Sequence, residues 1–121
     1  MTQGNPKVLV VEDEPLLLMT AIDVVESAGL EAVTACDADE AVRLLESMPD
    51  IRILFTDIHM PGSMDGLKLA AVVRERWPPI EIIVVSGMKR PDATEMPEHS
   101  VFFSKPYDMR DVSDALIKMA A

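Results

Sequence analysis

The sequence contains a single cysteine, Cys36, and no Cys/His spacing of the kind that binds metal ions. A lone cysteine has no partner for an internal disulfide, so a fold held by disulfide bonds is excluded. We expect Cys36 to be a small, partly buried residue that follows a strand.

Basic residues are also scarce: 11 lysines and arginines face 21 acidic residues, and the net charge is -10. This charge repels a phosphate backbone and an anionic membrane surface, which argues against direct nucleic-acid or membrane binding. Long apolar runs are missing, and the opening "MTQGNPK" lacks the apolar core of a secretory signal. We therefore expect a cytoplasmic protein.

The chain has 121 residues, of which 49% are hydrophobic, and it contains no repeat or low-complexity segment. This length suits one domain with a real core and is too short for two. We expect residues 1–121 to form one folding unit.

Short apolar and β-branched runs predict five strands. The run "KVLVV" at residues 7–11 is too short for a helix and is followed by the acidic "EDEP", which is typical of a fully buried strand. The weakly alternating "EAVTA" suits an edge strand. The remaining strands are expected at residues 52–57, 80–86 and 101–104.

Helical periodicity separates these runs. Pro15 fits a first helical turn and Gly29 a C-terminal stop, so a helix is predicted over residues 15–28. Asp37, with Glu40 three residues later, resembles a capping box for a second helix.

Two further helices are predicted in the second half of the chain. Asp65 is the expected N-cap of a third helix, which ends before Pro78. Asp108 begins a last helix, whose inward side chains are expected to be Met109, Val112, Leu116 and Met119.

Residues 87–99, "GMKRPDATEMPEH", contain two prolines and few apolar positions, so a fourth helix there would be short or irregular. We predict high mobility in this segment, and strong amide protection across residues 88–98 would contradict it.

Strands that alternate with helices imply right-handed βαβ crossovers and a parallel sheet covered on both faces. The predicted fold class is α/β, a doubly wound five-stranded parallel sheet.

Polar side chains gather where the predicted strands end. Glu12 and Asp13 follow the first strand, Asp57 ends the third, Ser86 ends the fourth, and Lys105 follows the fifth. The carboxyl ends of parallel strands meet at one edge of a sheet, where such folds bind ligands.

Each of these residues also has a purely structural interpretation. Asp13 precedes a proline and could cap the first helix. Ser86 and Lys105 could each be solvated loop residues. Asp57 is harder to explain this way, because "IHMP" follows it and no helix begins there.

The combination of the five residues predicts a phosphoryl-transfer site. Two carboxylates about 4 Å apart repel by roughly 4 kcal/mol at an effective dielectric near 20, so three together require a cation or a raised pKa. Oxygen ligands favour Mg²⁺, which leaves room for a phosphate that Lys105 and Ser86 would contact. In this interpretation Asp57 is a nucleophile that forms an aspartyl phosphate.

These segments resemble the receiver domain of two-component response regulators. The resemblance covers nearly the whole chain, from "VLVVEDEP" through "FTDIHMPGSMDG" and "IIVVSG" to "FFSKPYD". It implies a flavodoxin-like sheet with strand order 2-1-3-4-5. It also implies that Asp57 accepts a phosphoryl group from a phosphohistidine on a histidine kinase or histidine phosphotransfer protein.

The resemblance further implies roles for individual residues. Mg²⁺ would be held by Asp13, Asp57 and the backbone carbonyl of His59, with Glu12 acting through water. The His59 imidazole would be neither a ligand nor a phosphate carrier, although this position and Met88 resemble positions that tune dephosphorylation.

The resemblance also implies a switch. Ser86 would follow the phosphoryl group on activation, and Phe102 would change rotamer with it. The Lys105–Pro106 bond resembles the family's cis peptide. Such a module catalyses only its own phosphorylation and dephosphorylation, and it switches the binding of a downstream protein.

Three features depart from the family pattern. Two residues, Gly62 and Ser63, separate the proline from "MDG" where one is common, which lengthens this loop. Phe102 replaces the frequent tyrosine, so no phenolic hydroxyl can form hydrogen bonds there and the coupling would be steric. The segment 87–99 replaces a regular helix on a face that receivers use for partner contacts.

Our leading hypothesis is a phosphorylation-switched module that works alone, without an output domain. One alternative is a small Mg²⁺-dependent phosphatase of the haloacid-dehalogenase type, but that family has a second carboxylate where this chain has His59. Another is a pseudo-receiver that binds proteins without the chemistry, although every acidic, hydroxyl and lysine position is present. A flavin-binding relative is disfavoured because the acidic "EDEP" loop would repel a phosphate.

Overall fold

The computed structural model describes residues 6–88 and 90–121. Residues 1–5 and 89 lie outside the described part, and they include most of the "MTQGNPK" stretch and one position of segment 87–99. None of the described helices is both long and apolar enough to cross a membrane.

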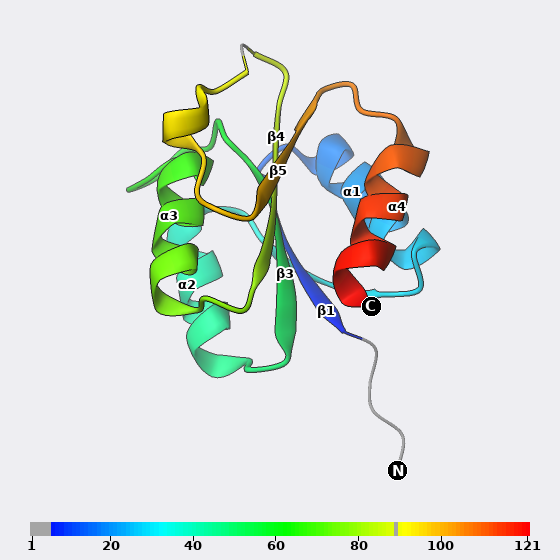
Figure 1. Ribbon diagram of the computed structural model, residues 1–121, viewed down its shortest axis with the longest axis horizontal. Coiled ribbons are helices and arrows are strands. Elements are labelled where there is room, and N and C mark those ends of the chain that lie inside the picture. The colour runs from blue at the N-terminus through cyan, green and yellow to red at the C-terminus, as the bar shows by residue number, and fades with distance from the viewer. Residues whose placement is uncertain (1–5, 89) are drawn as a thin grey trace.

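Five parallel strands form one sheet, in the order β2-β1-β3-β4-β5 (Figure 1). This confirms the predicted fold class and strand order, and each boundary lies within one residue of its prediction. The strands are β1 (Lys7–Val11), β2 (Glu31–Ala35), β3 (Ile51–Asp57), β4 (Glu81–Ser86) and β5 (Ser100–Ser104).

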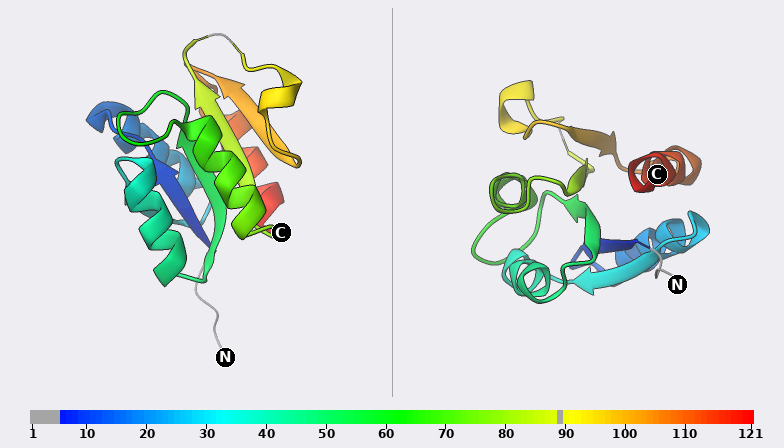
Figure 2. Two further views of the ribbon diagram at one scale, coloured as in Figure 1. Left: turned by 90° about the vertical axis from the view of Figure 1, so that its left-hand side faces the viewer. Right: turned by 60° about the horizontal axis from the view of Figure 1, so that its bottom comes forward.

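Helices cover both faces of the sheet. Figure 2 shows helices on both sides of the sheet, as expected for right-handed crossovers. On one face lie α1 (Pro15–Ser27) and α4 (Met109–Ala120), and on the other lie α2 (Ala38–Ser47) and α3 (Gly66–Arg76).

The central strands are buried on both faces, because alternate side chains enter separate cores. Leu9 and Leu54 pack toward α2 and α3, whereas Val10 and Phe55 pack toward α1 and α4. All four side chains are almost completely buried. This explains why β1 and β3 are continuous apolar runs rather than alternating ones.

The helix caps correct several details of the predictions. Glu14, not Asp13, is the N-cap of α1, so Asp13 remains available to the site. Asp37 caps α2 as predicted, but the Glu40 carboxylate accepts its hydrogen bond from the Cys36 amide rather than from Asp37. The Cys36 side chain is exposed, contrary to expectation.

One inward prediction for the last helix is wrong. Asp108 caps α4, and Val112 and Leu116 are buried as predicted. Met109, however, is 45% exposed. Periodicity gives the direction of a side chain, but it does not say whether a neighbouring element extends far enough to cover it.

The segment between β4 and β5 contains one 3₁₀ turn, Ala93–Glu95, in place of a regular helix. This agrees with the predicted short or irregular helix. The end of the segment is held by Arg74 of α3, whose guanidinium donates to the carbonyls of Glu98 at 2.8 Å and His99 at 3.2 Å. His99 adopts a left-handed conformation with φ of 58°.

Candidate functional site

Three carboxylates meet at the carboxyl edge of the sheet. Glu12 and Asp13 follow β1 and Asp57 ends β3, and these strands are neighbours in the sheet. One carboxylate oxygen from each of the three residues lies within 4.8 Å of the chosen oxygens of the other two. Glu12 and Asp57 are only 5% and 6% exposed, whereas Asp13 is exposed to solvent. The group is therefore reachable from solvent on the Asp13 side.

Lys105 supplies the cation of the site. Its ammonium lies 2.9 Å from Asp57 Oδ1 and 3.0 Å from Glu12 Oε1. Burial lowers the pKa of this ammonium, but the hydrogen bonds to both carboxylates outweigh burial, so the pKa lies above its ordinary value. Lys105 is therefore charged at neutral pH. The Lys105–Pro106 peptide bond is cis, and the Lys105 amide donates to Ser86 O at 2.8 Å.

The backbone around Asp57 is fixed by contacts on both sides. The Thr56 hydroxyl donates to the Asp57 carbonyl at 2.9 Å, and the Ile58 amide donates to Val85 O at 3.0 Å. The Gly66 amide donates to Ile58 O at 2.8 Å. These contacts hold the end of β3 between β4 and the first turn of α3.

Gly66 is a positioning residue that the sequence analysis did not identify. A Cβ at this position would lie 1.9 Å from the Asp57 carbonyl oxygen and 2.9 Å from the Ile58 Cα. Both are backbone atoms, so only glycine allows α3 to begin this close to β3. The signal in the sequence was the glycine of "MDG", directly after the Asp65 cap.

Ser86 and Phe102 lie on β4 and β5. Ser86 is fully buried, and its hydroxyl oxygen accepts a hydrogen bond from the Met88 amide at 3.0 Å. Phe102 is 9% exposed, and the Arg90 guanidinium lies 5.2 Å from the centre of its ring. The Ser86 hydroxyl proton is therefore free to point toward another acceptor.

His59 stands apart from the carboxylate group. Its side chain is exposed and lines a surface cavity of about 330 Å³ together with Asp65 and Arg90. Among the described residues, the side chains grouped to hold a metal ion are Glu12, Asp13 and Asp57. The His59 imidazole is not one of them.

The lengthened loop contacts the start of α2. Ser63 Oγ donates to Asp39 Oδ1 at 2.7 Å, and Gly62 adopts a left-handed φ of 108° that favours glycine. Met60 and Met64 pack partly buried against the core on the α2 and α3 side. The two residues that depart from the family pattern thus form the turn and the tether of this loop.

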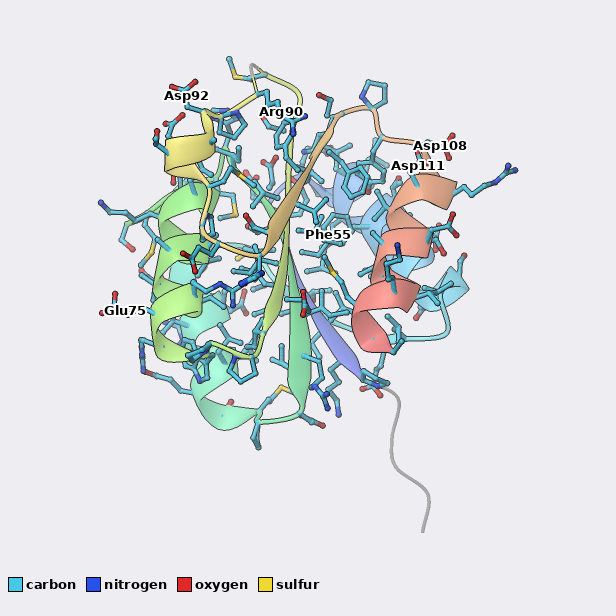
Figure 3. All side chains as sticks on the ribbon, viewed as in Figure 1. Phe55, Glu75, Arg90, Asp92, Asp108 and Asp111 are labelled. Carbon is cyan, nitrogen blue, oxygen red and sulfur yellow. The ribbon has the colours of Figure 1, made fainter. Side chains whose placement is uncertain are left out.

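A cavity beside the carboxylates was also not foreseen. It has a volume of about 470 Å³ and runs from Glu12, Asp57 and Lys105 along apolar side chains of α1 and the sheet. Tyr107 lines it, with its ring 6.0 Å from that of Phe55. Figure 3 shows Phe55 between the sheet and α4. Burial raises the pKa of Tyr107.

The carboxylate group fits a hard divalent cation. Mg²⁺ prefers oxygen ligands, is commonly held by one or two carboxylates, and retains several waters. A buried pair with one exposed carboxylate supplies such ligands and leaves a side open to water and phosphate. The group is therefore an acidic pocket able to hold a metal ion.

Comparisons with known proteins agree with this geometry. Residues 8–117 match the model of the response regulator receiver domain. The chain is 32% identical over 81 residues to the nitrogen assimilation regulatory protein NtrX of Azorhizobium caulinodans, which covers 66% of this chain and 18% of that protein. The chain spans less than a fifth of the length of the first curated relatives it matches.

Solved structures share the fold. A response regulator receiver protein from Sinorhizobium medicae matches with a TM-score of 0.88 and 25% identity, over 96% of this chain and 94% of that one. The response regulator TrrA from Thermotoga maritima, solved in complex with Mg²⁺ and BeF, matches with a TM-score of 0.81 and 24% identity, over 93% and 97%. This second likeness shows the fold alone. With the family model matched over most of the sequence, the chain belongs to the response regulator receiver domain family.

Proposed function

We propose that residues 1–121 act as one phosphoacceptor module of a two-component phosphorelay, phosphorylated on Asp57. The observation that carries this proposal is the placement of Asp57. Its carboxylate is buried at the end of a central strand, paired with Lys105 at 2.9 Å and grouped with two further carboxylates. Burial of a charged group is costly, so this grouping of carboxylates is not expected for residues with a structural role alone.

The proposed donor is a phosphohistidine on a histidine kinase or a histidine phosphotransfer protein. A carboxylate oxygen of Asp57 attacks phosphorus, a P–O bond forms as the P–N bond breaks, and the imidazole nitrogen keeps the electron pair and takes up a proton. Lys105 lies beside the attacking carboxylate, where its fixed charge opposes the negative charge of the transferred group.

The proposed metal is Mg²⁺, held by Asp13, Asp57 and the backbone carbonyl of His59, with Glu12 acting through water. When bound, the ion would neutralise charge on the phosphoryl oxygens. Glu12 has a second role that the structure supports, because its carboxylate accepts from Lys105 at 3.0 Å and holds the ammonium next to Asp57.

Phosphorylation is proposed to switch the binding of a downstream protein in the cytoplasm. The phosphoryl group adds about -1.5 to -2 charges beside Ser86, whose hydroxyl proton can turn toward it. Phe102 would then change rotamer. Because this residue lacks a phenolic hydroxyl, the coupling would act through packing, starting with the Arg90 guanidinium now over its ring.

The test is the intact mass of the protein after incubation with Mg²⁺ and a small phosphodonor, compared with the Asp57→Asn variant. We expect one added phosphoryl group, which is absent in the variant and absent without Mg²⁺. An unchanged mass of a folded wild-type protein would overturn the proposal and favour a pseudo-receiver. Repeated turnover of a generic phosphate ester would favour a phosphatase.

A further inference from the structure

β5 is the last strand of the sheet, and its outer edge has no strand partner among the described residues. The Lys105 amide donates to Ser86 O on β4, so the Lys105 N–H faces β4. Backbone direction alternates along a strand, so the N–H groups of Phe102 and Ser104 point away from β4. These two groups are donors on an open edge.

A cavity lies beside this edge. It has a volume of about 530 Å³ and is lined by residues of the 3₁₀-turn segment and of β5. The apolar ones include Met96, Pro97, Val101 and Phe102, and the polar ones are Arg90, Glu98 and Ser100. The segment before β5 forms only the short turn Ala93–Glu95. An apolar side chain that reached the edge of β5 could thus contact Met96, Val101 and Phe102 in this cavity.

Acidic side chains flank the edge on both sides. Figure 3 shows β5 in the foreground, with Asp92 on one side and Asp108 and Asp111 on the other. Arg90 lies at the carboxyl end of the edge, over the Phe102 ring. The exposed carboxylates of the two flanks are Asp92, Glu95 and Glu98 before β5, and Asp108, Asp111 and Asp114 after it; exposed cations on α4 are Arg110 and Lys118.

We propose that the outer edge of β5 binds an extended segment of a partner protein in which apolar and basic side chains alternate. The segment would add as a strand and accept hydrogen bonds from the Phe102 and Ser104 amides. Successive side chains of a strand point to opposite faces. Apolar side chains would therefore enter the cavity on one face, and basic ones would meet the carboxylates of α4 on the other.

The charges argue for a different protein rather than a second copy of this chain. The β5 sequence "SVFFS" contains no basic residue, and a second copy would bring another net charge of -10 to the interface. The proposal does not depend on phosphoryl transfer, because the edge amides, the cavity and the flanking carboxylates are all present in the unphosphorylated protein.

The test uses a short synthetic peptide in which lysine alternates with valine and leucine. We expect it to bind and to slow amide exchange at Phe102 and Ser104 by about tenfold or more, as expected for newly hydrogen-bonded edge amides. Exchange at Phe103 should not change, because its N–H faces β4. A peptide with glutamate in place of lysine, and one with a methylated backbone, should not bind.

Charge variants test the contribution of the flanks. The double variant Asp111→Lys and Asp114→Lys, at two exposed positions of α4, should weaken peptide binding by about tenfold, because two carboxylates that attract the peptide lysines become cations that repel them. The matched control, Glu26→Lys and Glu75→Lys, changes the net charge equally on α1 and α3 and should weaken it by less than about threefold.

Four results would overturn the proposal. Three come from the peptides: equal binding of the glutamate peptide, equal binding of the methylated peptide, or slowed exchange that omits Phe102 and Ser104. An edge already occupied by a second copy would overturn it too. Light scattering would detect that copy as a dimer whose Phe102 and Ser104 amides are protected without peptide.

Discussion

The tightest backbone contact of the site predicts a large effect of one added methyl group. Gly66 begins α3 with its amide bonded to Ile58 O, and a Cβ there would lie 1.9 Å from the Asp57 carbonyl oxygen and 2.8 Å from its carbonyl carbon. Neither atom can move without moving β3. The φ angle of Gly66 is not left-handed, so the conflict in Gly66→Ala is steric.

The magnitude follows from two terms. Overpacking a well-packed site costs about 1–3 kcal/mol, and weakening the hydrogen bond from Gly66 to Ile58 adds about 0.5–1.5 kcal/mol. We expect Gly66→Ala to lower the free energy of unfolding by about 2–4 kcal/mol. This is a large share of the roughly 5–15 kcal/mol of a typical domain.

Urea unfolding followed by the fluorescence of Trp77, the only tryptophan, measures this loss. With a urea dependence of about 1–3 kcal/mol per molar, the midpoint should fall by about 1–2 M. The phosphorylation rate should fall by roughly 10- to 100-fold, because displacement of Asp57 by about 1 Å spoils its alignment.

Gly87→Ala is the matched control. A Cβ at Gly87 would meet only the Lys105 Cβ, at 3.8 Å, which is an ordinary contact. We expect a midpoint close to that of the wild type. If Gly66→Ala unfolded at the same urea concentration as Gly87→Ala, the close approach of α3 to β3 would be refuted.

Three further predictions concern other residues. Burial raises the pKa of Tyr107, the only tyrosine, and the charge of Lys105 lowers it, so phenolate absorbance should titrate above pH 10.0 in the native protein and higher still in Lys105→Met. Because the pKa is higher in the folded than in the unfolded state, the stability contributed by Tyr107 should fall as pH rises through 10.0, and equal titration midpoints of the native and unfolded protein would contradict this. Arg74→Met removes donors to four backbone carbonyls and should cost about 1–3 kcal/mol in urea unfolding, whereas Arg76→Met, at a surface ion pair, should cost less than about 1 kcal/mol. Amides of residue 88 and residues 90–98 should exchange rapidly, and hydrogen exchange that found strong protection there would show the segment to be rigid.

The strands could be predicted closely because their signal is local. The run at residues 7–11 is apolar at every position but the first, and β1 spans Lys7–Val11. A sheet buried on both faces demands such runs. Proline and glycine gave the ends of α1 in the same way, with Pro15 as its first residue and Gly29 just beyond it.

The site could be predicted because parallel topology brings the strand ends together. Glu12, Asp57 and Lys105 are far apart in the sequence, but each follows or ends a strand, and the structure joins them within 3.0 Å of the Lys105 ammonium. Their roles in phosphoryl transfer remain predictions that the proposed mass measurement tests.

Features set by contacts between distant segments could not be predicted. Ser63 is tethered to Asp39 across 24 positions, and no local pattern gives that distance. The clash at Gly66 depends on where α3 meets β3, which requires the packed structure. The sequence suggested only Asp13 as a cap for the first helix, whereas the structure uses Glu14, which leaves Asp13 for the carboxylate group.

Repulsion within the carboxylate group lowers the stability of the folded protein. Two of its members are buried, and a single ammonium lies between them, so the site retains net negative charge before any cation binds. At about 4 Å and an effective dielectric near 20, each pair of carboxylates repels by roughly 4 kcal/mol. Replacing Asp57 with asparagine removes one of these charges, while its amide oxygen can still accept from Lys105. A loss of phosphorylation in Asp57→Asn therefore reports on the missing nucleophile rather than on a weakened fold.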